Sequence, residues 1–288
     1  MTIVEAGMVQ QRRGAAAARH GNRVSYVNTN GISKKKRKRC RVGRRRPVLP
    51  TVPQVLQDLF FSCREVFKGP GTVPQPIEVI KLCQILDKMR PEDFGLSSDL
   101  QFFQTTDIVQ GNPRVTSTTV YQCNEFSLCI FFLPATAVIP LHNHPGMTVF
   151  SKLLWGQMHI KSYDWVDPAN SEESVPASHL RLAKLEANSV FTAPCDTSVL
   201  YPTTGGNIHQ FTAKTPCAVL DVLGPPYSHD RDCSYYRDFS YSTFSNGETT
   251  GVTEERESYA WLEEIEMPEN SQMDYIEYLG PQITDTGF

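Results

Sequence analysis

The feature that most constrains the fold is a series of short apolar segments that begins near residue 101. The segments are rich in Val, Ile, Thr, Phe and Tyr, and turn-forming Gly, Pro, Asn and Asp lie between them. Many short strands at this spacing indicate an all-β sandwich or barrel rather than alternating strand–helix units. We predict strands at 115–123, 126–132, 148–154, 156–163, 179–185, 189–192, 198–201, 208–213, 217–223 and 275–279.

Two amphipathic helices are predicted before the strands. Apolar residues recur at helical spacing over 52–68 and again over 76–89. Gly69-Pro-Gly71 ends the first segment and Pro91 stops the second. A short helix is also predicted at 257–266. The longest apolar stretch, 126–141, is broken by prolines and polar residues, so we interpret it as two buried strands and predict no membrane span.

The charges divide the chain into two parts. Residues 1–46 hold 14 of the 28 Lys and Arg and a single acid, which gives +13, and residues 47–288 carry −16. Because the first part has almost no large apolar residues, we predict a disordered basic tail at 1–46 and one domain at 47–288. The tail contains a run typical of a nuclear-import signal, formed by Lys34, Lys35, Lys36, Arg37, Lys38 and Arg39.

Several expectations about partners and location follow from these patterns. The run favours an import receptor; a nucleic-acid contact or a merely solvated tail are the alternatives. An acidic body repels phosphates, so any nucleic-acid binding is confined to the tail and is salt-dependent. The eight cysteines include no Cys-x-x-Cys pair, and no secretory signal is present, so we expect reduced thiols. We expect a monomer in the nucleus and cytoplasm.

Three histidines form the candidate metal site. His142 and His144 lie in Pro-Leu-His-Asn-His-Pro-Gly-Met, and His209 lies in Gly-Gly-Asn-Ile-His-Gln-Phe. His-x-His in a strand places both imidazoles on one face, and a third His from a later strand can complete a triangle around a metal. Three protein ligands leave coordination positions open, which favours catalysis or ligand binding over a structural site. The alternative is a set of hydrogen-bonded core histidines.

A cupin-type double-stranded β-helix, or jelly-roll barrel, suits this order of strands and histidines. Cupins usually carry an acid four to five residues after the second His, where this chain has Thr148 and Val149. An all-neutral ligand set leaves the metal its full charge, which favours an anionic co-ligand such as a thiolate. Imidazole suits Fe(II), Zn, Ni or Cu, so the ligands alone do not name the metal. We interpret His159, His179 and His229 as surface or packing residues, and His20 as part of the tail.

The histidine motifs, together with Val-Leu-Asp-Val-Leu-Gly-Pro-Pro-Tyr at 219–227 and Cys-Ser-Tyr-Tyr at 233–236, resemble the plant cysteine oxidases. These enzymes are relatives of animal 2-aminoethanethiol dioxygenase, and the resemblance covers about residues 50–280. It implies a cupin barrel in which the three histidines hold Fe(II), with O2 as co-substrate. It also implies oxidation of a protein's N-terminal Cys to the sulfinic acid, a step that is hard to reverse. The family's known substrates are group VII ethylene response factors, transcription factors that this oxidation marks for arginylation and degradation. The resemblance therefore implies a role in oxygen sensing in the hypoxia response.

Further site residues follow from this chemistry. A peptide N-terminus offers an amine, so an acid in the pocket is useful, and Asp221 lies an even number of residues after His209. The resemblance supports Asp221 as a substrate-positioning or catalytic residue, with a backbone-capped acid as the alternative. It also implies that Tyr227 lies at the pocket edge and donates a hydrogen bond to sulfur or oxygen; a packed turn tyrosine is the alternative. Cys233 and Tyr235 match the positions of a cysteine–tyrosine crosslink discussed for the animal relative, and we predict that they are not crosslinked here.

Other functions remain open at this point. Within enzymes, the alternative is a dioxygenase for a small thiol, either cysteamine or free cysteine. A different class is a non-enzymatic, metal-binding cupin regulator. The complete histidine set without an acid and the Asp221–Tyr227 segment favour the enzyme.

Overall fold

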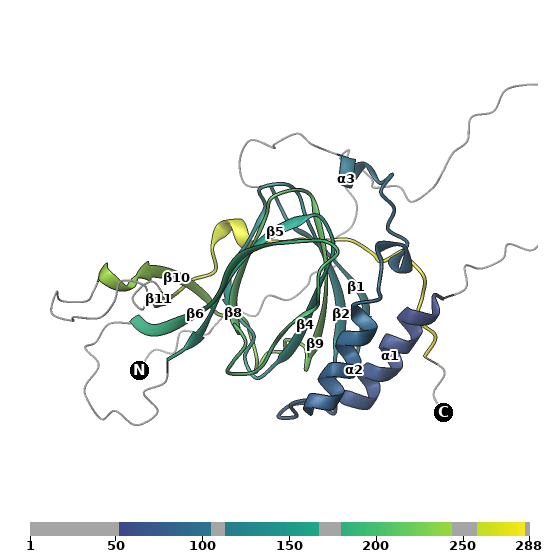
Figure 1. Ribbon diagram of the computed structural model, residues 1–288, viewed down its shortest axis with the longest axis horizontal. Coiled ribbons are helices and arrows are strands. Elements are labelled where there is room, and N and C mark those ends of the chain that lie inside the picture. The colour runs from purple at the N-terminus through teal and green to yellow at the C-terminus, as the bar shows by residue number, and fades with distance from the viewer. Residues whose placement is uncertain (1–51, 105–112, 167–179, 244–257, 286–288) are drawn as a thin grey trace, which may run out of the picture. The chain divides into compact units, whose positions relative to one another are not determined.

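The computed structural model describes residues 52–104, 113–166, 180–243 and 258–285 (Figure 1). The predicted basic tail, with its import-like run, lies outside these residues. Within the described ranges strands dominate, and the two long helices precede all of them in the chain. The prediction of a β-dominated barrel with N-terminal helices is confirmed.

The strands form two sheets that enclose the interior of the barrel. One sheet has the order β12-β1-β2-β9-β4-β7, and the other, β10-β11-β6-β5-β8-β3, closes on itself. The strands of the first sheet are β1 (Thr116–Gln122), β2 (Ser127–Leu133), β4 (Thr148–Trp155), β7 (Ser198–Leu200), β9 (Cys217–Gly224) and β12 (Asp274–Tyr275). Those of the second are β3 (Val138–Asn143), β5 (Gln157–Trp165), β6 (Leu180–Thr192), β8 (Ile208–Ala213), β10 (Tyr235–Ser240) and β11 (Tyr259–Ile265).

Strand β9 separates two apolar layers. Leu220 and Val222 lie on its outer face, in a buried cluster with the helices. Val219 lies on the inner face, in a cluster with Phe211 of β8 and Ile139 of β3. Because side chains alternate along a strand, one face of the sheet packs against the helices and the other face lines the barrel interior. The even-numbered residues of β9 therefore pack against the helices, and the odd-numbered residues face the barrel interior.

The helices cover the outer face of the first sheet (Figure 1). Helix α1 (Gln54–Val66) buries Leu59 and Phe60 completely, as the helical spacing of its apolar residues predicts. Helix α2 (Pro76–Leu86) begins with a proline at its first turn, where a missing N–H costs nothing. The second predicted helix is confirmed but ends at residue 86, and a short 3-10 helix, η1 (Pro91–Phe94), follows it. Two apolar residues of α2, Ile77 and Ile80, stay 72% and 51% exposed.

The predicted helix at 257–266 is wrong, because β11 occupies residues 259–265. Ala260 and Leu262 are buried and alternate with more exposed neighbours, which is the period of a strand. β11 pairs with β10 on one side and with β6 on the other. Two strand partners therefore overrule the helix propensity of the glutamates in this segment.

Other strand boundaries also differ from the predictions. The separate strands expected at 179–185 and 189–192 are one long strand, β6. β10 was not predicted, and the final strand is only Asp274–Tyr275. The seven cysteines in the described ranges are all free thiols, as expected. None of the helices in those ranges is long and apolar enough to cross a membrane.

Candidate metal centre

The three predicted histidines meet inside the barrel. His142 in β3 and His209 in β8 are direct partners across two antiparallel strands. The three imidazole rings lie with centroids 4.8 to 4.9 Å apart, and their nearest nitrogen atoms fall within 4.8 Å of one another. All three side chains are buried. His144 differs from the expectation in one respect, because β3 ends at Asn143 and His144 is the next residue.

Hydrogen bonds on the outer nitrogens of His142 and His144 orient these two rings toward the third. The Nδ1 atom of His142 lies 2.8 Å from the carbonyl oxygen of Pro140, and the Nδ1 atom of His144 lies 2.8 Å from the hydroxyl of Tyr227. The Nε2 atoms are thereby left for a metal, and those of His144 and His209 are 3.1 Å apart. Such outer partners fix the tautomer of a ligating imidazole.

The protonation of the rings suits metal binding. Burial lowers the pKa of His142, and it lowers the pKa of His144 and His209 well below the ordinary value. Positive charge on a neighbouring histidine lowers the pKa of His144 and His209 further. A neutral imidazole is the form that ligates a metal, so the site is ready to bind one near neutral pH.

Asp221 is a buried carboxyl on the inner face of the first sheet. It lies in β9, directly between Cys129 of β2 and Ser151 of β4. Burial raises the pKa of Asp221 to about 7, and a hydrogen bond from the Ser151 side chain acts in the opposite direction. Its Oδ1 atom is buried without any hydrogen-bond partner. A buried acceptor without a partner is costly, so this oxygen is free to receive a donor from a ligand.

Comparison with known proteins identifies the family. Residues 85–283 match the family model PCO_ADO. The chain belongs to this family. It is 47% identical to plant cysteine oxidase 2 of Arabidopsis thaliana over 91% of this chain and 95% of that protein. It is 28% identical to human 2-aminoethanethiol dioxygenase over 77% of this chain and 88% of that protein.

Membership in the PCO_ADO family makes the protein a thiol dioxygenase, an oxidoreductase with cysteine dioxygenase activity. Among solved structures, an RmlC-like cupin from Desulfovibrio desulfuricans aligns with 43% of this chain and 97% of its own, at 16% identity and a TM-score of 0.28. The resemblance of the chain to the plant cysteine oxidases is confirmed over 91% of its length.

Tyr227 lies against His144 of the candidate metal centre. Its hydroxyl is 2.8 Å from both His144 Nδ1 and the carbonyl oxygen of Asn143. If His144 ligates through Nε2, its Nδ1–H donates to the tyrosine, and the tyrosine donates to Asn143. The hydroxyl therefore lies on the far side of the His144 ring from the point where the Nε2 atoms meet. Burial raises the pKa of Tyr227 well above its usual value.

Cys233 and Tyr235 are close neighbours in this structure. Burial raises the pKa of the Cys233 thiol to about 11, and hydrogen bonds to the Tyr235 and Tyr227 side chains act in the opposite direction. Tyr235 pairs with His142 across β10 and β3, and the two ring centroids are 6.5 Å apart. The two residues that match the crosslink positions of the animal relative, and that we predict are not crosslinked here, therefore lie at the edge of the metal centre.

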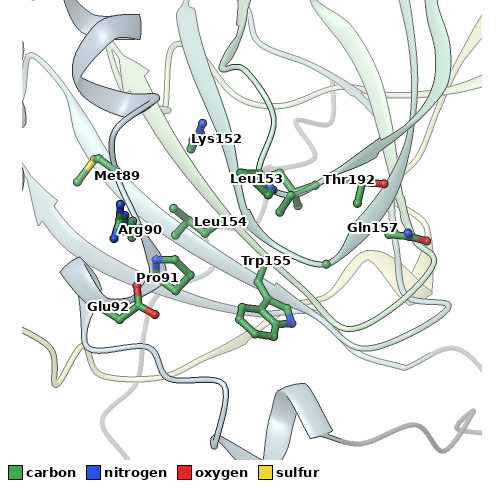
Figure 2. A pocket seen from close by; sticks show the side chains of 13 residues that line it. Met89, Arg90, Pro91, Glu92, Lys152, Leu153, Leu154, Trp155, Gln157 and Thr192 are labelled. Atoms are coloured by element: carbon green, nitrogen blue, oxygen red, sulfur yellow. The ribbon is translucent and has the colours of Figure 1, made fainter.

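Two other histidines and one pocket lie apart from the three-histidine centre. His159 Nε2 is 2.9 Å from the Asn188 side chain, and the His229 side chain is 97% exposed. His20 and His179 fall outside the described ranges. Figure 2 shows a pocket of about 440 Å³ where η1 meets the β4–β5 turn, lined by Arg90, Lys152 and Trp155 among others. No predicted site residue lines this pocket.

Sequence reasoning missed the polar groups that surround the histidines. Asn143, between the two histidines of the motif, binds the backbone of Ser234 and the hydroxyl of Tyr236. Asn207 binds the backbone of His144 on both sides. Arg231 donates to the carbonyl of Pro226 and keeps a buried Nε without a partner. The only sequence signal was the position of both asparagines within the histidine motifs, Asn143 between His142 and His144 and Asn207 two residues before His209.

Proposed function

We propose that the enzyme is an Fe(II)-dependent dioxygenase that converts the N-terminal cysteine of proteins to cysteine sulfinic acid. The observation that carries this proposal is the convergence of three buried, neutral imidazoles without a carboxylate ligand. A neutral donor set leaves the metal its positive charge, which favours coordination of a thiolate. Plant cysteine oxidase 2, which is 47% identical to this chain, is named for cysteine as the group that it oxidises, and this supports cysteine as the substrate here.

The donor set fits Fe(II). Imidazole is a ligand of intermediate softness, and a facial set of three with open positions suits an iron that must also accept a thiol and dioxygen. His142, His144 and His209 would hold the ion through Nε2. Bound iron supplies the redox chemistry that couples dioxygen to the thiol, and the protein supplies binding, orientation and electrostatics.

Asp221 is the group that we assign to the substrate's N-terminal amine. An ammonium group is a triple donor with positive charge, and the Oδ1 atom of Asp221 is a buried acceptor without a partner. The charge of the ammonium would favour the ionised form of a carboxyl whose pKa burial raises to about 7. Cysteamine also carries an amine, and free cysteine adds a carboxylate that Asp221 would repel. An N-terminal cysteine in peptide linkage avoids that repulsion.

The reaction balances without another reductant. Both atoms of dioxygen are transferred to the sulfur, which is oxidised as dioxygen is reduced. The thiol proton ends on the sulfinic acid or in solvent. The sulfinic acid is more oxidised than the reversible sulfenic acid and is hard to reduce, so the modification of the substrate is lasting. We propose that transcription factors resembling the group VII ethylene response factors are the substrates, and that arginylation and degradation follow.

The direct test uses metal-free protein loaded with Fe(II) under anaerobic conditions. A Cys-initiated peptide is added, oxygen is admitted, and the peptide is followed by mass spectrometry. We expect a gain of two oxygen atoms on the N-terminal cysteine, loss of this product in His209→Ala, and retention in His159→Ala. His159 is a matched control, because its ring binds Asn188 and not the metal centre.

The same assay separates the alternatives. A peptide left unchanged by iron-loaded enzyme would refute the proposal. Turnover of cysteamine or free cysteine under those conditions would assign the enzyme to small thiols. A protein that binds iron but oxidises none of the three thiols would be a metal-binding regulator.

We further propose that the enzyme reports oxygen levels in the nucleus and cytoplasm. The proposed product forms at a rate that depends on dioxygen, and the basic run at 34–39 is of the kind that import receptors bind. The oxygen dependence is tested by initial rates at graded oxygen concentrations; saturation at the lowest concentration would refute sensing. The import signal is tested by replacing the six basic residues with alanine in a fluorescent fusion, and an unchanged nuclear fraction would refute it.

A further inference from the structure

The third histidine of the centre is not held by a strand. His142 and His209 are paired residues in the β3–β8 ladder, so the backbone bonds of the sheet fix them. His144 follows the end of β3 and is succeeded at once by Pro145-Gly146, with Gly146 at φ +66°. Its carbonyl accepts a bond of 3.2 Å from the N–H of Met147, which closes this turn. The position of His144 therefore needs another support.

The side chain of Asn207 supplies that support. Its Oδ1 accepts the backbone N–H of His144 at 3.1 Å, and its Nδ2 donates to the carbonyl oxygen of His144 at 2.9 Å. A carboxamide has the same donor and acceptor as a peptide group. Asn207 thus gives His144 the two bonds that a neighbouring strand would give it. The second Nδ2 hydrogen donates to the carbonyl oxygen of Tyr201 at 2.7 Å.

Asp164 holds Asn207 in turn. This buried carboxylate at the end of β5 accepts the backbone N–H of Asn207 at 2.9 Å and that of Gly206 at 3.0 Å. Gly206 has φ +81°, and a Cβ atom there would collide with Ser162. Ser162 is the β5 partner of His209. The turn before His209 is therefore clamped against β5 by charge-assisted bonds and by close packing.

We propose that Asn207 is a positioning residue for the metal site, which holds the backbone of His144 in the place of a missing strand, and that Asp164 fixes Asn207 for this task. The inference rests on the three-histidine metal site of the proposed function. It adds that the affinity for metal depends on a side chain that never touches the ion. Without the amide, His144 would remain tethered only by its turn and by the Tyr227 hydroxyl on its ring.

The test measures metal affinity instead of turnover. Co(II) is titrated into metal-free protein in competition with a chelator, and the intensity of its ligand-field bands reports the coordination geometry. Changes to groups that orient metal ligands typically cost about 10- to 100-fold in affinity. We expect Asn207→Ala to weaken Co(II) binding by about that factor and to alter the ligand-field spectrum.

Two further variants keep the result interpretable. Asn207→Ser keeps a small polar group that cannot reach both the N–H and the carbonyl oxygen of His144, so we expect a loss in the same direction, on the order of tenfold. Asn188→Ala is the matched control, because Asn188 binds the ring of His159, which is not a ligand. Circular dichroism of the metal-free proteins tests whether each variant is folded. If Asn207→Ala does not fold, Asn207→Ser decides the question.

The outcomes distinguish this inference from the proposed function. Co(II) affinity in the folded Asn207 variants equal to that of the parent would overturn the positioning role and leave the metal site intact. A parent protein that binds no Co(II) would refute the metal site itself, and the inference with it. A loss in the Asn207 variants that Asn188→Ala does not share would establish the role.

Discussion

The buried carboxyl of Asp221 should make the metal-free protein less stable as the pH rises. Asp221 is 4% exposed, one of its oxygens has no partner, and burial raises its pKa to about 7 from an ordinary 3.8. A carboxyl whose pKa is higher in the folded protein than in the unfolded chain binds its proton more tightly when folded. It destabilises the fold progressively above about pH 4, and the full cost is present above about pH 7.

The magnitude follows from the size of the shift. Roughly three pKa units, at about 1.36 kcal/mol each, correspond to about 4 kcal/mol of destabilisation at high pH. This is an upper value, because water that enters near the carboxylate would solvate it. The carboxamide in Asp221→Asn cannot ionise, so the variant should lack this pH-dependent cost. We therefore expect the variant to gain up to about 4 kcal/mol on the parent between pH 4 and pH 8.

The assay is urea unfolding of metal-free parent and variant at a series of pH values. Metal must be absent, because a bound cation would favour the ionised carboxyl. The buried histidines act in the opposite direction: their lowered pKa values destabilise the fold at low pH. They are present in both proteins, so the difference between the two stability curves isolates Asp221.

Parallel stability curves for parent and Asp221→Asn would refute the reasoning. They would mean that Asp221 is solvated or paired in the folded protein and that its raised pKa is absent. Asp99→Asn, at an exposed position, controls for the loss of one carboxyl. The Asp221→Asn variant should also lose oxidation of a Cys-initiated peptide, so a gain in stability would accompany a loss of function.

Three further predictions concern other parts of the molecule. Phe126→Ala removes a fully buried ring between the helices and the first sheet, and urea unfolding should show a loss of about 3–5 kcal/mol; a loss below about 1 kcal/mol would contradict the packing described. Tyr227→Phe leaves the outer nitrogen of His144 without its partner, so Co(II) affinity should fall about tenfold, whereas unchanged affinity would deny the hydroxyl that role. Cys233 and Tyr235 should remain unlinked after turnover, so tryptic peptides containing them should show unmodified masses, and a mass lower by two hydrogens would disprove this.

The sequence was sufficient for the parts of the fold that repeat a simple period. The first helix was predicted because its apolar residues recur every three to four positions, and α1 spans residues 54–66. The segment 257–266 misled because Glu263, Glu264 and Glu266 favour a helix in isolation. Its pairing with β10 and β6 is a long-range contact that no local pattern contains. Local sequence patterns predicted the secondary structure of the first helix correctly. They failed for β11, because its hydrogen bonds come from strands far away in the chain.

The three histidines of the candidate metal centre could be predicted, but the groups that support them could not. His142 and His209 followed from the two-residue strand period and the motif spacing, and the structure pairs them. The expectation that His144 shares the strand of His142 was wrong, since β3 ends one residue earlier. Asn207 and Asp164 escaped prediction because their task is to bind backbone groups far away in the chain. A side chain that makes the backbone hydrogen bonds of a neighbouring strand leaves no periodic pattern in the sequence.

The helical layer has a consequence for where the chain can be shortened. The family match begins at residue 85, inside α2, although α1 contributes Leu59 and Phe60 to the layer over the first sheet. Protein starting at residue 85 would keep every metal ligand but would leave a wide apolar face open to water. Such a face drives self-association. The smallest fragment that stays monodisperse should therefore include α1, which begins at residue 54, well before the region by which the family is recognised.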